Sequence, residues 1–288
     1  MGQRTGFSTI LMMACLCLLF SWKMASAGDG GDIVPRHAFA IGVGVSHFDN
    51  EEKAEDAERG GPEWDGWMYG VAGHYTYHND IMIHTSLHVS AGDLDYRGGT
   101  TRLFPGGQTV QEPAEKDADS NTVECRGLLG YDFPFRERHL ITPFLGIGYR
   151  YWREDRGGVG GYEREVAYWY CPIGLRTYSP LSDAWIWGMK AEYDLFLDGE
   201  VDSDISRMPS FHYDSGYGMR FSLCFRRELT KHMALLLEPY VTYWDMDESD
   251  VELFALPGGS DGEPYTVFPF IEPDNHTTTC GLWISLEF

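Results

Sequence analysis

The sequence predicts an all-β fold: a closed, ten-stranded antiparallel up-and-down transmembrane β-barrel with five long extracellular loops and four short periplasmic turns. Three observations lead to this prediction. Apolar and polar residues alternate with a period of two over ten segments. The connections between these segments are alternately short and long. The last segment alternates up to the terminal Phe288, where a free terminus would usually be polar.

The amino terminus is expected to be a signal peptide over residues 1–27. Arg4 precedes an apolar run from about Ile10 to Phe20, and a small-residue Ala-Ser-Ala follows. A membrane-anchoring helix needs ~20 apolar residues, and Trp22 and Lys23 interrupt the run before that length. Residues 28–288 are then expected to form one barrel domain.

The charge of the chain argues against nucleic acid as a partner. The formal net charge is -22, and it becomes -24 when Arg4 and Lys23 are removed with the signal peptide. A chain this acidic is a poor ligand for nucleic acid. No segment after the signal peptide approaches 18 consecutive apolar residues, so no transmembrane helix is expected there.

Each alternating segment exceeds the ~5–6 residues typical of soluble strands and matches the ~9–11 that a tilted membrane strand needs. The ten predicted strands are residues 36–48, 66–78, 81–94, 121–133, 139–152, 165–178, 184–198, 215–226, 232–245 and 277–288.

The connections are sorted by length. Four connections are short: Asn-Asp, Pro-Phe-Arg-Glu-Arg, Ser-Pro-Leu-Ser-Asp and Arg-Glu-Leu-Thr-Lys. The other connections are long and rich in Gly, Asp and Glu. Outer-membrane barrels have short periplasmic turns and long extracellular loops. A soluble sandwich or lipocalin-like barrel, which is the alternative, gives no reason for this sorting.

The two faces of the strands indicate a barrel with lipid outside. In residues 184–198 the apolar face carries Trp, Met, Tyr and Leu, and the other face carries Lys190, Glu192, Asp194 and Asp198. The charged face of 139–152 also holds Gly146 and Gly148, which suits a crowded interior. Aromatic residues lie near the ends of the apolar faces, as in an interfacial girdle.

The last segment must close the barrel. No sheet edge can remain unpaired in hydrocarbon, because each unpaired backbone group costs several kcal/mol. The strand that ends at Phe288 is therefore expected to pair with both the ninth and the first strands.

Four cysteines follow the signal peptide: Cys125, Cys171, Cys224 and Cys280. They lie on the fourth, sixth, eighth and tenth predicted strands, no two of which are adjacent. Alternate strands are about 9–10 Å apart, beyond the ~7 Å limit for a disulfide. Four free thiols are therefore predicted, with Cys224 facing inward and the other three facing lipid.

At this level the chain resembles the small outer-membrane β-barrel proteins of Gram-negative bacteria, the opacity-protein and OmpA-like, porin-family barrels. The most specific match is the ending Leu282, Ile284, Leu286 and Phe288, which is similar to the signal such proteins present to the barrel-assembly machinery. OmpA-like proteins often add a periplasmic peptidoglycan-binding domain. Nothing follows Phe288 here, so anchoring to the cell wall is not implied.

The inward-facing charged residues are expected to form a lumen network. Eight strands make a barrel that side chains just fill, and porins need ~16 strands for an open channel, so ten strands favour a filled lumen over a narrow small-solute pore. The expected network is Glu124, Arg126, Arg150, Arg176, Lys190, Glu192, Asp194, Arg220 and Glu238.

A second alternative is an enzyme, because the strand count is similar to that of the omptin proteases of the outer membrane. The resemblance implies an acidic pair at Asp93 and Asp95 and a general base at His212 oriented by Asp214. Ser210 stands where the omptin pattern has an aspartate, and this departure leaves the catalytic set incomplete.

No metal site or cofactor is expected. His84 and His88 share a strand face but lie ~13 Å apart, too far to bind one ion, and His74 is expected to be a polar lumen residue. The acidic run 245–252 lacks the spacing and glycine of a calcium loop. We therefore expect a structural or surface-interacting barrel in the cell outer membrane, with lipid as its surroundings, an extracellular ligand that the sequence does not identify, and no assigned enzyme activity.

Overall fold

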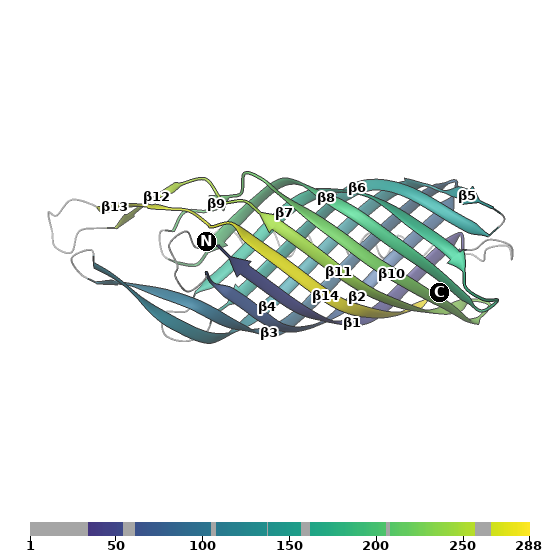
Figure 1. The fold of residues 1–288 in the computed structure, drawn as a ribbon, viewed down its shortest axis with the longest axis horizontal. Helices are drawn as coiled ribbons and strands as arrows, with labels where there is room; N and C mark the ends of the chain where they lie inside the picture. Colours follow the sequence, from purple (N-terminus) through teal and green to yellow (C-terminus); the bar gives the residue numbers. More distant parts are fainter. Residues whose placement is uncertain are drawn as a thin grey trace.

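A computed structural model describes residues 34–53, 61–104, 108–136, 138–156, 162–205, 208–256 and 266–288. Ten long antiparallel strands form a closed barrel (Figure 1). Within the described ranges, no helix has the length and apolarity needed to cross a bilayer. The expected signal peptide, residues 1–27, lies outside the described residues.

The ten barrel strands follow one another around the sheet in chain order. They are β1 (His37–Glu52), β2 (Glu63–Asn79), β3 (Ile81–Phe104), β4 (Gln108–Tyr131), β6 (His139–Asp155), β7 (Glu163–Pro180), β8 (Trp185–Ser203), β10 (Gly216–Thr230), β11 (Met233–Met246) and β14 (Asn275–Glu287). Four short strands are accessory: β5 (Phe133–Phe135) pairs with β6, β9 (Phe211–His212) with β8, and β12 (Glu252–Leu256) with β13 (Thr266–Phe270).

The last strand closes the barrel, as the sequence predicted. β14 pairs with β11 on one side and with β1 on the other, where Val43 lies opposite Ile284. At the periplasmic end, the Phe39 backbone N–H donates to the Phe288 carbonyl at 3.1 Å, and the Phe288 N–H donates to the Phe39 carbonyl at 2.8 Å. Ile284, Leu286 and Phe288 are exposed on the outer face, and Leu282 is half-buried.

The apolar face points outward and forms the band that meets lipid. Exposed aliphatic residues cover the middle of the wall on most strands, and aromatic residues mark its two borders. The extracellular border includes Trp67, Tyr69, Trp169 and Tyr193, and the periplasmic border includes Tyr131, Phe133, Phe135, Trp187 and Phe288.

The strands extend further at the extracellular end than the sequence predicted. The connection expected between the third and fourth strands is instead a β-hairpin, because β3 and β4 stay paired up to Phe104 opposite Gln108. A strand outside the bilayer needs no apolar face, so apolar and polar residues alternate only weakly along it. The sequence pattern therefore predicts a loop there.

One predicted face is wrong. Asp198 was expected inside the barrel, but it is exposed and lies opposite the lipid-facing Trp169. The register between β7 and β8 shifts at this point, so that Tyr170 pairs with Phe196 and Leu197 is the extra residue. A β-bulge reverses the alternation of the residues that follow it, which no period-two pattern shows in advance.

All four described cysteines are free. They lie on β4, β7, β10 and β14, and another strand separates each from the next. Cys224 lines the interior, and Cys280 is exposed on the outer wall.

Gly148 on β6 is required by close packing inside the barrel. A Cβ placed there would lie 2.1 Å from the ring of Tyr170, a fully buried residue. Gly148→Ala is therefore expected to lower the free energy of unfolding by about 1–3 kcal/mol. Urea titration of the folded barrel in detergent micelles measures this change. Gly127→Ala is the matched control, because no atom lies within 4 Å of its added Cβ. An equal loss in the two variants would contradict the packing argument.

Candidate functional site

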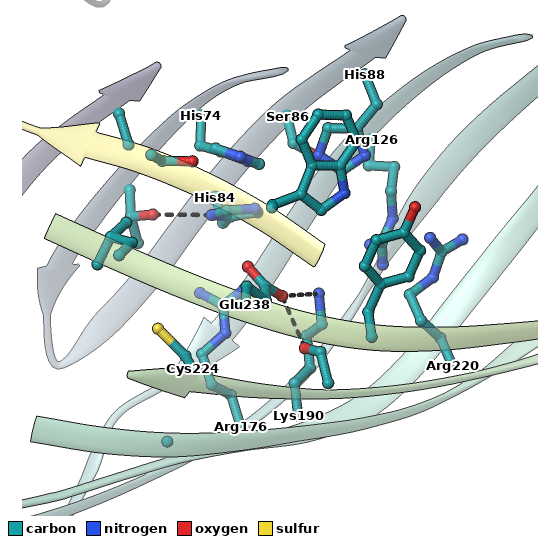
Figure 2. A pocket seen from close by; sticks show the side chains of 18 of the residues that line it. His74, His84, Ser86, His88, Arg126, Arg176, Lys190, Arg220, Cys224 and Glu238 are labelled. Atoms are coloured by element: carbon teal, nitrogen blue, oxygen red, sulfur yellow. Dashed lines mark hydrogen bonds and ion pairs between the residues drawn. The ribbon is translucent and has the colours of Figure 1, made fainter. Parts of the chain in front are cut away.

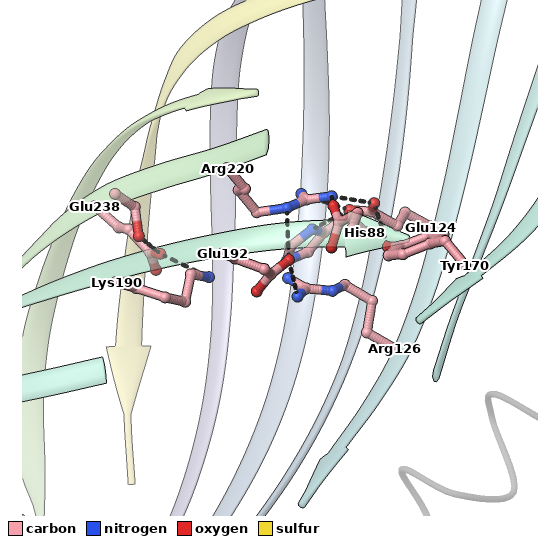
Figure 3. Close-up of polar contacts among 10 residues, drawn as sticks. His88, Glu124, Arg126, Tyr170, Lys190, Glu192, Arg220 and Glu238 are labelled. Carbon is pink, nitrogen blue, oxygen red and sulfur yellow. Dashed lines mark hydrogen bonds and ion pairs between the residues drawn. The ribbon is translucent and has the colours of Figure 1, made fainter. Parts of the chain in front are cut away.

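An ion-pair network crosses the lumen around Arg220 (Figure 3). The Arg220 guanidinium donates two hydrogen bonds to Glu124, at 2.6 and 3.0 Å, and lies 3.2 Å from Glu192 and 3.6 Å from Asp194. Arg126 pairs with Glu192. Glu192 and Asp194 are 6% and 1% exposed, so these charges depend on one another rather than on water.

The expected network residues divide into two groups. Seven of the nine form ion pairs with one another, since Lys190 also lies 3.5 Å from Glu238. The other two cations make different contacts: Arg150 lies over the Tyr168 ring at 6.0 Å, and Arg176 contacts the Met82 sulfur at 3.8 Å.

Three histidines gather on the lumen side of β2 and β3 (Figure 2). Ser86 lies directly opposite His74, which places His84 and His88 on the two diagonals. The His74 ring centroid is 6.0 Å from that of His84 and 5.0 Å from that of His88.

A cluster of buried aromatic and apolar side chains, here named the aromatic cap, fills the barrel on the extracellular side of the network. The Trp244 ring lies 4.7 Å from that of Tyr168 and 5.0 Å from that of Tyr170. The cap comprises Phe48, Trp64, Met68, Leu94, Tyr96, Ala118, Trp152, Val166, Tyr168, Tyr170, Val201, Phe211, Tyr213, Trp244 and Met246.

A second charged cluster, the rim cluster, lies above the cap and outside the membrane-spanning band. Arg164 pairs with Glu52 at 2.8 Å and with Glu272 at 2.9 Å, and Arg156 pairs with Glu154. Arg156 also lies over the rings of Tyr96, Tyr162 and Trp64, at 4.0, 4.5 and 4.9 Å. The rim cluster therefore joins β1, β6 and β7 to the segment that precedes β14.

The rim cluster has three carboxylates for two guanidinium groups, so it favours retention of a proton. Burial outweighs the attraction of Arg164 and raises the pKa of Glu52 to about 7. A raised carboxyl pKa contributes stability that is fully present below its value in the unfolded chain and is lost as the pH rises through the folded value.

The wild-type barrel is therefore expected to lose roughly 1–3 kcal/mol of unfolding free energy between about pH 5 and pH 8 from this group. Glu52→Gln removes the titrating proton and should flatten this part of the profile, which urea titrations at the two pH values measure. Glu248→Gln is the control, because Glu248 is exposed and its side chain forms no ion pair within the described part of the chain. The same pH slope in Glu52→Gln and wild type would contradict the assignment.

The structure does not bring the omptin-like residues together. Asp93 and Asp95 are exposed on the outer wall, and the alternate positions Leu94 and Tyr96 point into the aromatic cap. His212 and Asp214 are exposed as well, while Phe211 and Tyr213 enter the cap. His212 is on β9, which pairs with β8, and the strands β4, β6 and β7 lie between β8 and β3. Side chains that point outward at these two places do not face a common cleft.

Carboxylates form two rows on the extracellular part of the outer wall. Asp49, Asp65, Asp95 and Asp117 lie opposite one another on β1 to β4, and Asp93, Asp119, Asp155 and Glu163 form the other row on β3, β4, β6 and β7. Among the described residues, Asp49, Glu51 and Glu63 are the one His/Cys/Asp/Glu group whose ligand atoms all lie within 4.8 Å of one another. This group is on the outside, away from the lumen.

Sequence reasoning missed the aromatic cap, although part of its signal was available. Trp152 shares its parity with Arg150, and Trp244 shares its parity with Glu238, so both belong to the inward face. The signal for the rim cluster was absent, because Glu52, Arg156 and Glu272 fall in segments that were expected to be loops.

Comparison with known proteins supports the fold and identifies the family. The chain is similar to the outer membrane protease OmpT from Escherichia coli, with a TM-score of 0.58 and 10% identity over 88% of this chain and 96% of OmpT. It is also similar to the translocator domain of the autotransporter NalP from Neisseria meningitidis, with a TM-score of 0.41 and 8% identity over 96% of each chain. No curated protein matches the chain in sequence.

At 10% identity, the likeness to OmpT shows the barrel fold alone. The family model of the autotransporter β-domain matches residues 27–206, which is more than half of the chain. The expected resemblance to opacity-protein and OmpA-like porins is corrected by this match. The chain is an outer-membrane β-barrel that belongs to the autotransporter β-domain family.

Proposed function

We propose that this protein is a non-conducting outer-membrane barrel that holds its extended extracellular strands at the cell surface. The observation that carries the proposal is that side chains occupy the lumen at two levels. The aromatic cap fills the extracellular level, and the network around Arg220 crosses the level below it. Within the described residues, buried ion pairs and close-packed rings at these two levels would block the passage of a hydrated ion.

The extracellular strands support a role in surface contact. The β3–β4 hairpin continues well beyond the lipid-facing band, and β12 and β13 form a second hairpin (Figure 1). The outer wall below the end of the β3–β4 hairpin carries the two rows of carboxylates. Its acidity favours cationic partners over anionic ones.

Planar-bilayer recording tests the closed lumen. The wild-type barrel, folded in detergent and incorporated into the membrane, is expected to give no single-channel steps. Heat-modifiable migration on a detergent gel verifies that the same preparation is folded. Reproducible steps from the folded protein would exclude the proposal and support the narrow small-solute porin instead.

Translocation of a passenger polypeptide is a second candidate, and the family match supports it. The aromatic cap and the network would have to be displaced for a chain to pass. A folded reporter fused ahead of residue 28 tests this candidate: display of the reporter at the cell surface supports translocation. Retention of the reporter in the periplasm, with the barrel inserted, would argue against it.

The protease alternative is tested by peptide hydrolysis with wild type, Asp93→Ala and His212→Ala. We expect no cleavage above background, because the four residues of the omptin-like set point away from the lumen. Cleavage by wild type that is lost in both variants would restore the enzyme hypothesis.

A further inference from the structure

A cavity lies in the lumen beneath the aromatic cap (Figure 2). Its volume is about 160 Å³, and it extends from Phe48 and Thr242, near the cap, to His78 and Glu287, near the periplasmic end. A cavity needs a volume of roughly 10–15 Å³ to hold a single water molecule, so this cavity has room for an ion with several heavy atoms.

The wall of this cavity is richer in cations than in carboxylates, although the whole chain has a net charge of -22. Three carboxylates line it, and each is paired with a cation: Glu124 with Arg220, Glu238 with Lys190, and Glu287 with Arg226. The six lining cations are Arg126, Arg150, Arg176, Lys190, Arg220 and Arg226.

Among the lining cations, Arg150 and Arg176 have no ion pair in the described part of the chain, and Arg150 lies over the Tyr168 ring and is only half-buried. The more buried of the two is Arg176. Its residue is 7% exposed, and in the described part of the chain no ion pair joins it to a carboxylate. Its polar contact is the weak acceptor sulfur of Met82, at 3.8 Å. A buried guanidinium without an anion is unfavourable by several kcal/mol, so a bound anion would supply the missing partner.

Further donors converge on the same space from the opposite wall. Arg176 and Lys190 project from β7 and β8, while His74 and His84 project from β2 and β3, and Figure 2 shows them pointing toward one another. His84 Nδ1 contacts the Thr76 hydroxyl at 2.8 Å, which orients its ring. Donors on two facing walls suit a tetrahedral oxyanion better than a planar carboxylate, which one guanidinium can satisfy from one side.

We propose that the lumen cavity binds a small tetrahedral oxyanion of the phosphate class. Arg176 supplies the main charge-assisted contact, Lys190 shares its charge between the ion and Glu238, and His74 and His84 complete the site. The aromatic cap separates this site from the extracellular side, so exchange takes place from the periplasmic end.

Equilibrium dialysis of the folded full-length chain against radiolabelled inorganic phosphate tests the site, with detergent and chloride held constant. Wild type is expected to bind one phosphate per chain with saturation below about 10 mM, and acetate is expected to compete poorly. Arg176→Gln is expected to weaken phosphate binding by about tenfold or more. The matched control is Arg227→Gln, which removes an exposed arginine that lies over the Trp185 ring, and it should leave binding within about twofold of wild type.

Two further variants provide a second measurement in case Arg176→Gln does not fold. Arg176→Lys should retain part of the affinity for phosphate, and Lys190→Gln should reduce that affinity. Absence of saturable binding by the folded wild type would overturn the proposal, and so would equal affinity in wild type and Arg176→Gln. Effective competition by acetate would overturn the tetrahedral preference. A barrel that neither conducts nor binds phosphate refutes this inference alone and leaves the proposed function in place.

Discussion

Arg220→Met is expected to lower the free energy of unfolding by about 3–5 kcal/mol, the effect typical of removing one partner from a buried ion pair. Arg220 faces three carboxylates, and its loss would leave Asp194 without a cation and Glu124 without its two hydrogen bonds. Most of the destabilisation comes from the charges left behind in a region that water reaches poorly. Urea titration in lipid vesicles, followed by tryptophan fluorescence, measures it.

The control is Arg153→Met, since Arg153 also pairs with a glutamate, Glu163, but both side chains are about one-third exposed. Exposed pairs contribute about 0–1 kcal/mol, so this variant should be close to wild type. Asp194→Asn in the Arg220→Met background should recover part of the loss, because it removes one uncompensated charge. Similar losses in Arg220→Met and Arg153→Met would show that the lumen pairs are solvated and would refute the buried network.

The barrel itself was predictable because lipid imposes a simple rule on every strand that crosses it. Val43, Leu145 and Ile284 face hydrocarbon, so the residues beside them in sequence face inward, and the period-two pattern records this directly. The pairing of β14 with β1 was predictable for the same reason, because unpaired backbone groups at an open sheet edge are too unfavourable in lipid.

The site was only partly predictable, because it depends on which inward residues meet across the lumen. Arg176 and His74 were expected inside the barrel, but their approach depends on strand order and register on opposite walls, which the alternation of single strands does not contain. The bulge at Leu197 shows the same limit, since one extra residue exposed Asp198. Outside the bilayer, lipid no longer imposes the period-two alternation on a strand. The rim cluster, with its pair of Glu52 and Arg164, could therefore not be predicted from that alternation.

Opening the lumen is expected to require changes at both levels. A cap variant, Trp64→Ala with Trp244→Ala, removes two fully buried rings, and each change should lower the unfolding free energy by about 3–5 kcal/mol. A network variant, Glu124→Ser with Asp194→Asn and Arg220→Ser, removes opposite charges together, which is far less destabilising than removing one partner.

Each variant alone should remain closed in planar bilayers, because the other level still blocks the lumen. The combination should give single-channel steps, since no ordered layer would then separate the cavity from the extracellular side. Heat-modifiable migration must first show that the combined variant folds, and Trp67→Ala, at an exposed position on the outer wall, controls for loss of a tryptophan. Conductance from the cap variant alone would place the whole barrier in the aromatic cap. A folded combined variant that stays closed would show that a different part of the chain seals the barrel.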